Sequence, residues 1–139
     1  MGRPGTLVLD SEGLSTVVAD DRQVMTLLRG AEQEDMRVIV SVLTHIEAHH
    51  RKVKTARFNW VVSRLTVEPV SEEIGRSAMK LLTDAGLHGH KYAIDAVVGA
   101  TALLMPKPAV VLTSDPEDLG LLCGDRVRII KVCHGSCKS

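Results

Sequence analysis

The chain has 139 residues, the size of one ordinary domain, and its 17 basic and 17 acidic side chains give a net charge of zero. Hydrophobic residues make up 45% of it but aromatic residues only 2%, so a core must consist mainly of aliphatic side chains. This composition excludes a disordered or fibrous chain. No apolar run reaches the roughly 18 residues that a membrane span requires. We therefore expect one soluble domain over residues 1–139.

The beginning of the chain and its cysteines indicate where the protein works. The first ten residues lack the apolar core of a signal peptide. Cysteines are odd in number, at Cys123, Cys133 and Cys137, which is not typical of a disulfide framework. Both features favour a reducing, cytoplasmic location.

Short aliphatic runs alternate with segments of helical periodicity. An acidic stretch at residues 10–13 predicts a turn after the first run, and residues 88–90 predict a loop. The strands are near-continuously apolar, which is typical of a parallel sheet covered on both faces, so the predicted fold class is α/β. The expected strands are residues 7–9, 38–40, 67–70, 109–113 and 127–132, and the expected helices are residues 20–30, 42–61 (one bent helix or a helical hairpin), 71–86, 92–105 and 116–122.

Several carboxylates lie against apolar runs. Asp10 directly follows the first strand, Asp115 closely follows the fourth, and Asp95 lies inside an apolar helix. A lone carboxylate in such surroundings is costly to desolvate unless it is paired, hydrogen-bonded or bound to a metal. The carboxyl ends of parallel strands are also where open α/β sheets bind ligands. Glu47, near the end of the second strand, adds a fourth acid to this group.

Carboxylate ligands without a matching cage of thiolates or imidazoles suit Mg²⁺ or Mn²⁺ rather than zinc. Simpler structural roles are open to most of these acids. Asp10 and Asp115 could cap the helices that follow them, and Glu47 could face solvent. Asp95 is hardest to explain in this way, because Lys91 is the only basic residue three or four positions from it.

Four segments in order resemble the PIN-domain family, and most closely the VapC toxins of bacterial toxin–antitoxin pairs. The resemblance covers nearly the whole chain. Its segments are Leu-Val-Leu-Asp-Ser at 7–11, Leu-Thr-His-Ile-Glu at 43–47, Tyr-Ala-Ile-Asp-Ala-Val-Val-Gly-Ala-Thr-Ala at 92–102 and Val-Leu-Thr-Ser-Asp-Pro-Glu-Asp-Leu at 111–119.

The resemblance implies a Rossmann-like α/β/α sandwich, RNA cleavage that depends on Mg²⁺ or Mn²⁺, a homodimer and inhibition by a cognate antitoxin protein. It gives auxiliary roles to Thr113 and Asp118. The sequence departs from the family at Glu12, where a Ser, Thr or Asn is usual, and this carboxylate either joins the metal site or turns outward. The predicted catalytic and metal-binding acids are Asp10, Glu47, Asp95 and Asp115.

A basic segment at residues 51–64 carries five basic and no acidic side chains. It either follows an RNA phosphate backbone or is a solvated helix face. Trp60, within it, either stacks on an unpaired base or, as we expect, belongs to the core. The predicted RNA contacts are Arg51, Lys52, Lys54 and Arg57.

Three other functions remain to be compared. His45 and His49 are four residues apart, the spacing of two zinc ligands on one helix face, but the His-Glu-x-x-His motif of metalloproteases is absent. A dinucleotide-binding domain is disfavoured because no Gly-x-Gly-x-x-Gly follows the first strand. A non-catalytic PIN-like module that binds RNA or protein is the third alternative. The further zinc ligands available to the histidine pair are His88, His90, Cys133, His134 and Cys137.

Overall fold

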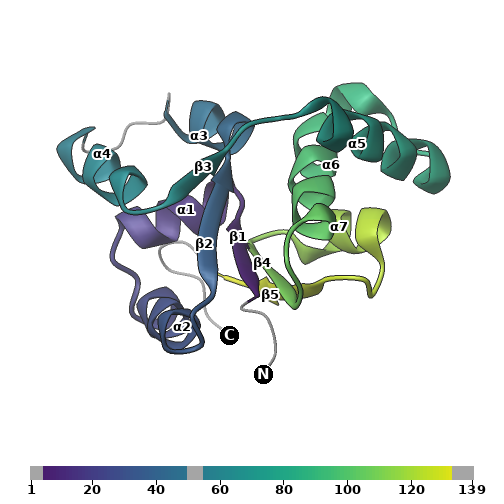
Figure 1. Cartoon of the computed structure of the whole chain (residues 1–139). Helices are drawn as coiled ribbons and strands as arrows, with labels where there is room; N and C mark the ends of the chain where they lie inside the picture. The colour runs from purple at the N-terminus through teal and green to yellow at the C-terminus, as the bar shows by residue number, and fades with distance from the viewer. Residues whose placement is uncertain (1–4, 50–54, 133–139) are drawn as a thin grey trace.

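A computed structural model describes residues 5–49 and 55–132, and within these ranges the chain forms five strands and seven helices (Figure 1). None of the helices in this part of the chain is long and apolar enough to cross a bilayer. The elements in chain order are β1 (Thr6–Leu9), α1 (Ser11–Val18), α2 (Arg22–Gln33), β2 (Arg37–Ser41), α3 (Val42–His49), α4 (Thr55–Ser63), β3 (Thr66–Glu68), α5 (Glu72–Ala85), α6 (Gly89–Leu104), β4 (Ala109–Thr113), α7 (Pro116–Cys123) and β5 (Arg128–Lys131).

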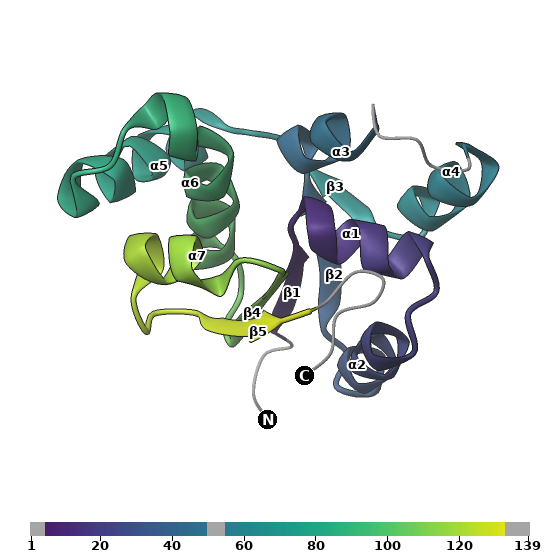
Figure 2. The same ribbon diagram turned by 180° about the vertical axis from the view of Figure 1, so that it is seen from behind.

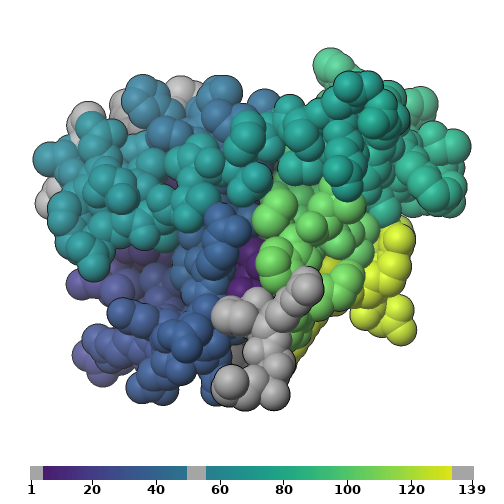
Figure 3. Space-filling model, viewed as in Figure 1, coloured from purple at the N-terminus to yellow at the C-terminus, as the bar shows by residue number. Residues whose placement is uncertain are grey.

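All strand pairs in the described sheet are parallel, in the order β3-β2-β1-β4-β5. Leu9 is in register with Val40 on one side and Leu112 on the other, so β1, β2 and β4 end at one level. Helices α1, α2 and α4 lie on one face of the sheet and α5, α6 and α7 on the other (Figures 1 and 2). In the space-filling view, atoms of the N-terminal half of the chain (purple and blue) are visible between the teal and green regions of the two helical layers (Figure 3). The predicted α/β sandwich around a parallel sheet is therefore confirmed.

The alternation of side chains along the strands divides the core in two. Val8 of β1 packs with the residues of α5, α6 and α7, whereas Leu7 and Leu9 pack with those of α1, α2 and α4. Each of these three side chains is at most 3% exposed. The apolar runs are near-continuous because both faces of the strands are buried, as the sequence indicated.

The turn predicted at residues 10–13 is wrong, because helix α1 begins there. Asp10 is its N-cap, and its side chain accepts the Gly13 N–H at 2.7 Å. The same acidic residues that are typical of a turn are also typical of a helix start, and the burial of Leu14 and Val17 selects the helix. The loop predicted at residues 88–90 is likewise shorter than expected, since α6 begins at Gly89.

The other predicted elements are present, with ends shifted by a few residues. Ser71 caps α5 by accepting the Ile74 N–H, and Gly86 ends it in the left-handed conformation with φ of 66°. Pro116 occupies the first turn of α7, where its missing N–H has no cost. The segment 42–61 is not one bent helix: α3 and α4 are separate, with residues 50–54 outside the described ranges.

Gly13 is needed where α1 approaches β4. A Cβ at this position would lie 2.7 Å from the Leu112 carbonyl oxygen, which is backbone and cannot move aside cheaply. We expect Gly13→Ala to destabilise the protein by roughly 1–3 kcal/mol, as overpacking does. Gly30→Ala, in α2 with nothing within 4 Å, is the matched control and should stabilise it by about 0.5–1 kcal/mol. Urea unfolding measures both, and the same sign for the two variants would contradict the close approach.

Candidate active site

The strand order of the sheet reverses at β1. From β1 it continues to β2 and β3 on one side, and then crosses to β4 and β5 on the other. A crevice forms at the carboxyl ends of strands that flank such a point, and open α/β sheets bind ligands there. Asp10 directly follows β1 and Asp115 lies two residues beyond the end of β4, so both lie at the carboxyl edge of the sheet beside this point.

Asp10 is held in place from two sides. Its carboxylate accepts hydrogen bonds from the Gly13 N–H of α1 and from the hydroxyl of Thr113 at the end of β4. The Thr113 hydroxyl in turn accepts the Asp115 N–H at 3.0 Å. Thr113 is 1% exposed, so this short relay is shielded from solvent. Burial raises the pKa of Asp10 to about 6, and the charge of Glu12 adds to the rise, while these hydrogen bonds counteract it.

Asp95 is the residue whose pKa responds to the charges of all the other predicted catalytic acids. It lies on α6, half-buried, and burial is the main cause that raises its pKa to about 6. The negative charges of the auxiliary acid Asp118 and of the rest of the predicted quartet raise it further. Acids that are far apart in the sequence therefore act electrostatically on one carboxyl group, that of Asp95. The acids whose charges act on Asp95 are Asp118, Asp10, Asp115 and Glu47.

Asp115 and Asp118 form the outer part of this acidic cluster, which we define as Asp10, Glu47, Asp95, Asp115 and Asp118. Asp115 occupies the N-cap position of α7 but its side chain makes no capping hydrogen bond, so capping does not explain it. Partial burial and the charge and hydrogen bond of Asp115 raise the pKa of Asp118, and Lys91 partly offsets this rise. Lys91 is thus a cation at the rim of the acidic cluster that sequence analysis did not assign to the site.

Glu47 and Glu12 are both half-buried. Glu47 lies on α3, close behind the end of β2, and does not face solvent freely as the simplest alternative required. Glu12 lies in the first turn of α1, and its charge acts on Asp10. Glu12 is therefore beside the acidic cluster, where its carboxylate adds to the local negative charge.

The donor set of the acidic cluster fits a hard divalent cation. All its ligating atoms are carboxylate oxygens, and a cation would relieve the repulsion that raises the pKa of Asp95. Among the described residues, no three acidic, histidine or cysteine side chains converge on one point as a closed cage does. Mg²⁺ does not need such a cage, because it is usually held by one or two carboxylates together with water and substrate phosphate. A tetrahedral zinc site does need one.

His45 and His49 do lie on one face of α3, but both rings pack against Phe58 of α4. The ring centroids are 5.5 and 5.8 Å from that of Phe58, which is 1% exposed. This packing gives the two histidines a structural role between α3 and α4. Cys133, His134 and Cys137 lie outside the described residues, and His88 and His90 are exposed at the start of α6.

The basic segment differs from its prediction at Trp60, whereas the RNA contact of Arg57 stays a prediction. Trp60 was expected in the core, but its side chain is 53% exposed. Arg57 is half-buried and donates hydrogen bonds to the carbonyl oxygens of Val17 and Val18 at the end of α1, with Asp20 3.5 Å away. Arg51, Lys52 and Lys54 lie outside the described residues.

Thr113 is a positioning residue for Asp10. Thr113→Val keeps the shape of the side chain but removes the hydrogen bond that favours the ionised carboxylate, so we expect the pKa of Asp10 to rise above about 6. NMR titration of the carboxyl carbons measures it. The matched control is Thr101→Val, also 1% exposed, whose hydroxyl donates to the Val97 carbonyl and should leave Asp10 unchanged. An unchanged pKa of Asp10 in Thr113→Val would show that the Thr113 hydroxyl does not influence this carboxyl group.

No protein-family model matches the chain, and no curated protein matches it. Solved structures do match. One is a chain in the crystal structure of VapBC2 from Rickettsia felis bound to a DNA fragment from their promoter, with a TM-score of 0.71 and 13% sequence identity over 92% of this chain and 99% of that chain. At this identity the likeness shows the fold alone. It confirms that the α/β/α sandwich is PIN-like.

Proposed function

We propose that the protein is a divalent-metal-dependent endoribonuclease that hydrolyses RNA phosphodiester bonds at the acidic cluster. The observation that carries this proposal is the shared field at Asp95, whose pKa is raised to about 6 by burial and by four other carboxylates. Such a concentration of like charges weakens the fold unless a cation compensates it. Perturbed titrating groups gathered in a crevice are typical of functional sites.

The cation would be Mg²⁺ or Mn²⁺, held by one or two carboxylates of the set Asp10, Glu47, Asp95 and Asp115 together with water and substrate phosphate. A bound divalent cation lowers the pKa of a coordinated water and neutralises charge on the phosphate. The chain itself keeps Asp10 oriented through Thr113 and through the Gly13 N–H. Hydrolysis by water needs no covalent nucleophile, which agrees with Cys123 being buried with a raised thiol pKa.

The biological role that we propose is that of the toxin of a toxin–antitoxin pair, inhibited by a cognate antitoxin. One structure of similar fold is VapBC2 bound to a DNA fragment from their promoter, which supports an assembly of this kind.

We also propose a homodimer. Ile46 on α3 and Met79 on α5 are 62% and 61% exposed, so apolar surface is available for a second copy, and sedimentation equilibrium measures the mass.

The test of the nuclease is cleavage of end-labelled single-stranded RNA with Mg²⁺ or Mn²⁺ and with excess chelator. We expect cleavage with either metal and none in chelator. Asp10→Asn and Glu47→Gln should abolish it, whereas Glu73→Gln, an exposed acid on α5, should not. Cleavage that continues undiminished in chelator would overturn the metal dependence.

The second candidate is a non-catalytic PIN-like module that binds RNA or protein. It predicts that RNA binds but is not cleaved under any metal condition, in the wild type as in Asp10→Asn. Without a cation the acidic cluster is negatively charged and repels RNA. This candidate therefore requires that RNA bind in spite of that repulsion. The same assay therefore discriminates the two functions.

A further inference from the structure

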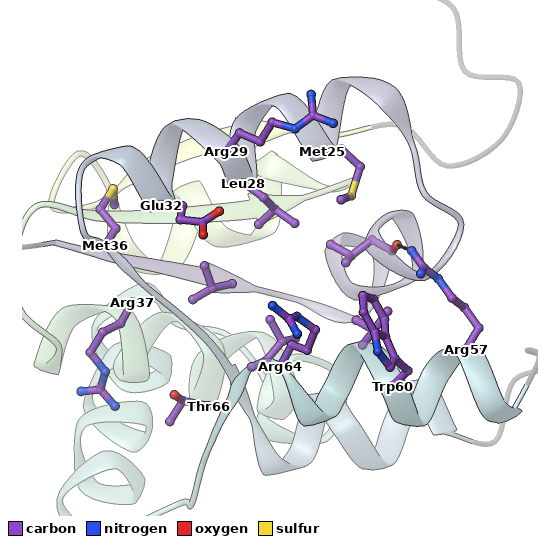
Figure 4. Close-up of a pocket in the computed structure, with 14 residues that line it drawn as sticks. Met25, Leu28, Arg29, Glu32, Met36, Arg37, Arg57, Trp60, Arg64 and Thr66 are labelled. Atoms are coloured by element: carbon purple, nitrogen blue, oxygen red, sulfur yellow. Dashed lines mark hydrogen bonds between the residues drawn. The ribbon is translucent and has the colours of Figure 1, made fainter.

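A cavity of about 470 Å³ lies between α2 and α4, beside β2 and the start of β3 (Figure 4). No member of the acidic cluster lines it. Its charged lining residues are one glutamate, Glu32, and four arginines, and Met25 and Leu28 of α2 contribute apolar surface. The cavity is therefore an apolar depression with an excess of positive charge. The four arginines are Arg29, Arg37, Arg57 and Arg64.

Trp60 of α4 lines this cavity between two arginines, Arg57 of the same helix and Arg64, which directly follows the end of the helix. The guanidinium carbons of Arg57 and Arg64 lie 5.0 and 5.3 Å from the centroid of its ring. In Figure 4 Trp60 of α4 and Arg64, just after α4, point toward α2. The indole is 53% exposed, so a flat group from solution has access to it.

The two arginines differ in how they are held. Arg57 is fixed by the carbonyl oxygens of Val17 and Val18 and by Asp20. Arg64 is exposed, and within the described part of the chain it makes no ion pair or side-chain hydrogen bond. Arg57 thus provides a fixed positive charge beside the indole, while Arg64 is able to leave the ring and bind an anion.

We propose that Trp60 is a stacking platform for an unpaired base of single-stranded RNA, with Arg64 binding the adjacent phosphate. This inference rests on the proposed function, to which it adds a second RNA-binding site away from the acidic cluster. Indole rings stack on any base because every base has a π face, and guanidinium groups bind phosphate in a bidentate way. An exposed tryptophan between two arginines presents both chemistries together.

The charge of the region favours RNA over an acidic segment of a partner protein. Residues 51–64 contain five basic and no acidic side chains, and arginines from α2 and β2 continue the positive charge around the cavity. The net positive charge of the cavity lining, four arginines against Glu32 alone, matches the negative charges of a phosphate backbone. A protein segment would bury the apolar surface of Met25 and Leu28 instead, without any need for the tryptophan to stay exposed.

Helix α1 connects this platform to the acidic cluster. Asp10 caps the beginning of α1, and the carbonyls that hold Arg57 belong to its last turn. A helix of eight residues is about 12 Å long. An RNA strand stacked on Trp60 would therefore reach the acidic cluster with its next few nucleotides.

The chain has a single tryptophan, so its fluorescence reports on this site alone. Oligouridylate is titrated into the full-length protein in excess chelator, where metal-dependent cleavage cannot occur. We expect saturable quenching of Trp60, and none with an RNA duplex or with polyglutamate. Trp60→Leu should weaken binding of labelled oligouridylate by at least about fivefold, the usual loss of one stacked base, and Trp60→Phe should retain part of it.

The arginine is tested by the salt dependence of binding. Arg64→Ala should reduce the slope of log affinity against log salt by roughly 0.7, the value for one phosphate contact of a single strand. Arg128→Ala removes the same charge from an exposed position of β5, at the opposite edge of the sheet from β3, and should leave the slope unchanged. Circular dichroism confirms that each variant is folded.

Two results would overturn the platform: unchanged Trp60 emission at saturating oligouridylate, or wild-type affinity in folded Trp60→Leu and Trp60→Phe. Quenching by polyglutamate but not by RNA would assign the cavity to a protein partner instead. These outcomes are separate from the nuclease test. RNA cleavage with silent Trp60 emission refutes the platform alone, and quenching without cleavage in Mg²⁺ refutes the nuclease alone.

Discussion

Asp95→Asn is expected to lower RNA cleavage in Mg²⁺ by more than about 100-fold, the upper loss typical of a residue that only supports a metal ligand. Asp95 is the residue on which the charges of the other cluster acids act together, so a cation held by the cluster lies in its field. Asparagine nearly preserves the volume of the side chain. The loss of activity will therefore report the missing charge rather than a cavity.

The same variant should leave the metal-free protein no less stable at pH 7.5. The carboxylate of Asp95 is ionised there although burial and neighbouring charges oppose ionisation, and asparagine removes this cost. Allowing for screening of a half-buried group, we expect a gain of roughly 1 kcal/mol in the free energy of unfolding. A purely structural Asp95, hydrogen-bonded in the core, predicts a loss of about 1–3 kcal/mol instead.

Thermal unfolding in chelator, run beside the cleavage assay, measures both effects. Asp84→Asn is the matched control, because Asp84 is an exposed aspartate on α5 paired with Lys80 at 3.1 Å. It should alter neither activity nor stability by a significant amount. A destabilised but fully active Asp95→Asn would refute the catalytic assignment of Asp95.

The second large effect is the pH dependence of stability without metal. The pKa values of Asp10 and Asp95 are about 6 in the folded protein and 3.8 in model compounds. Between these values the folded state binds protons that the unfolded state does not bind. The contribution of these two groups to stability is therefore greatest below about pH 4 and is lost as the pH rises through about 6.

The difference between the wild type and Asp95→Asn isolates this contribution from all other titrating groups. We expect the advantage of the asparagine variant to shrink as the pH falls from 7.5 to 5, because the wild-type carboxyl becomes protonated. Saturating Mg²⁺ at pH 7.5 should raise the stability of the wild type by about 2.7 kcal/mol at 100 times its dissociation constant, and by much less at pH 5. An unfolding temperature that Mg²⁺ does not change at pH 7.5 would contradict a cation at the acidic cluster.

The sequence alone determined the elements whose signals are local. Aliphatic runs buried on both faces predicted the strands, because a parallel sheet between two helical layers leaves no polar face. Ser71, Gly86 and Pro116 marked helix ends because capping chemistry depends on a few adjacent residues. The quartet of acids could also be selected from the sequence, since an unpaired carboxylate in an apolar run requires an explanation.

Only the tertiary structure decided questions that depend on long-range contacts. Local chemistry at residues 10–13 fits a turn or a helix start, and the burial of Leu14 and Val17 selects the helix. Trp60 is exposed because the chain already has Phe58 for the core on the inner face of α4, where His45 and His49 pack around it. Arg57 binds the end of α1, a contact with residues some 40 positions away that no local pattern encodes. The gathering of four further acids around Asp95 likewise follows from strand order and crossover direction, because these place the ends of distant segments at one edge of the sheet.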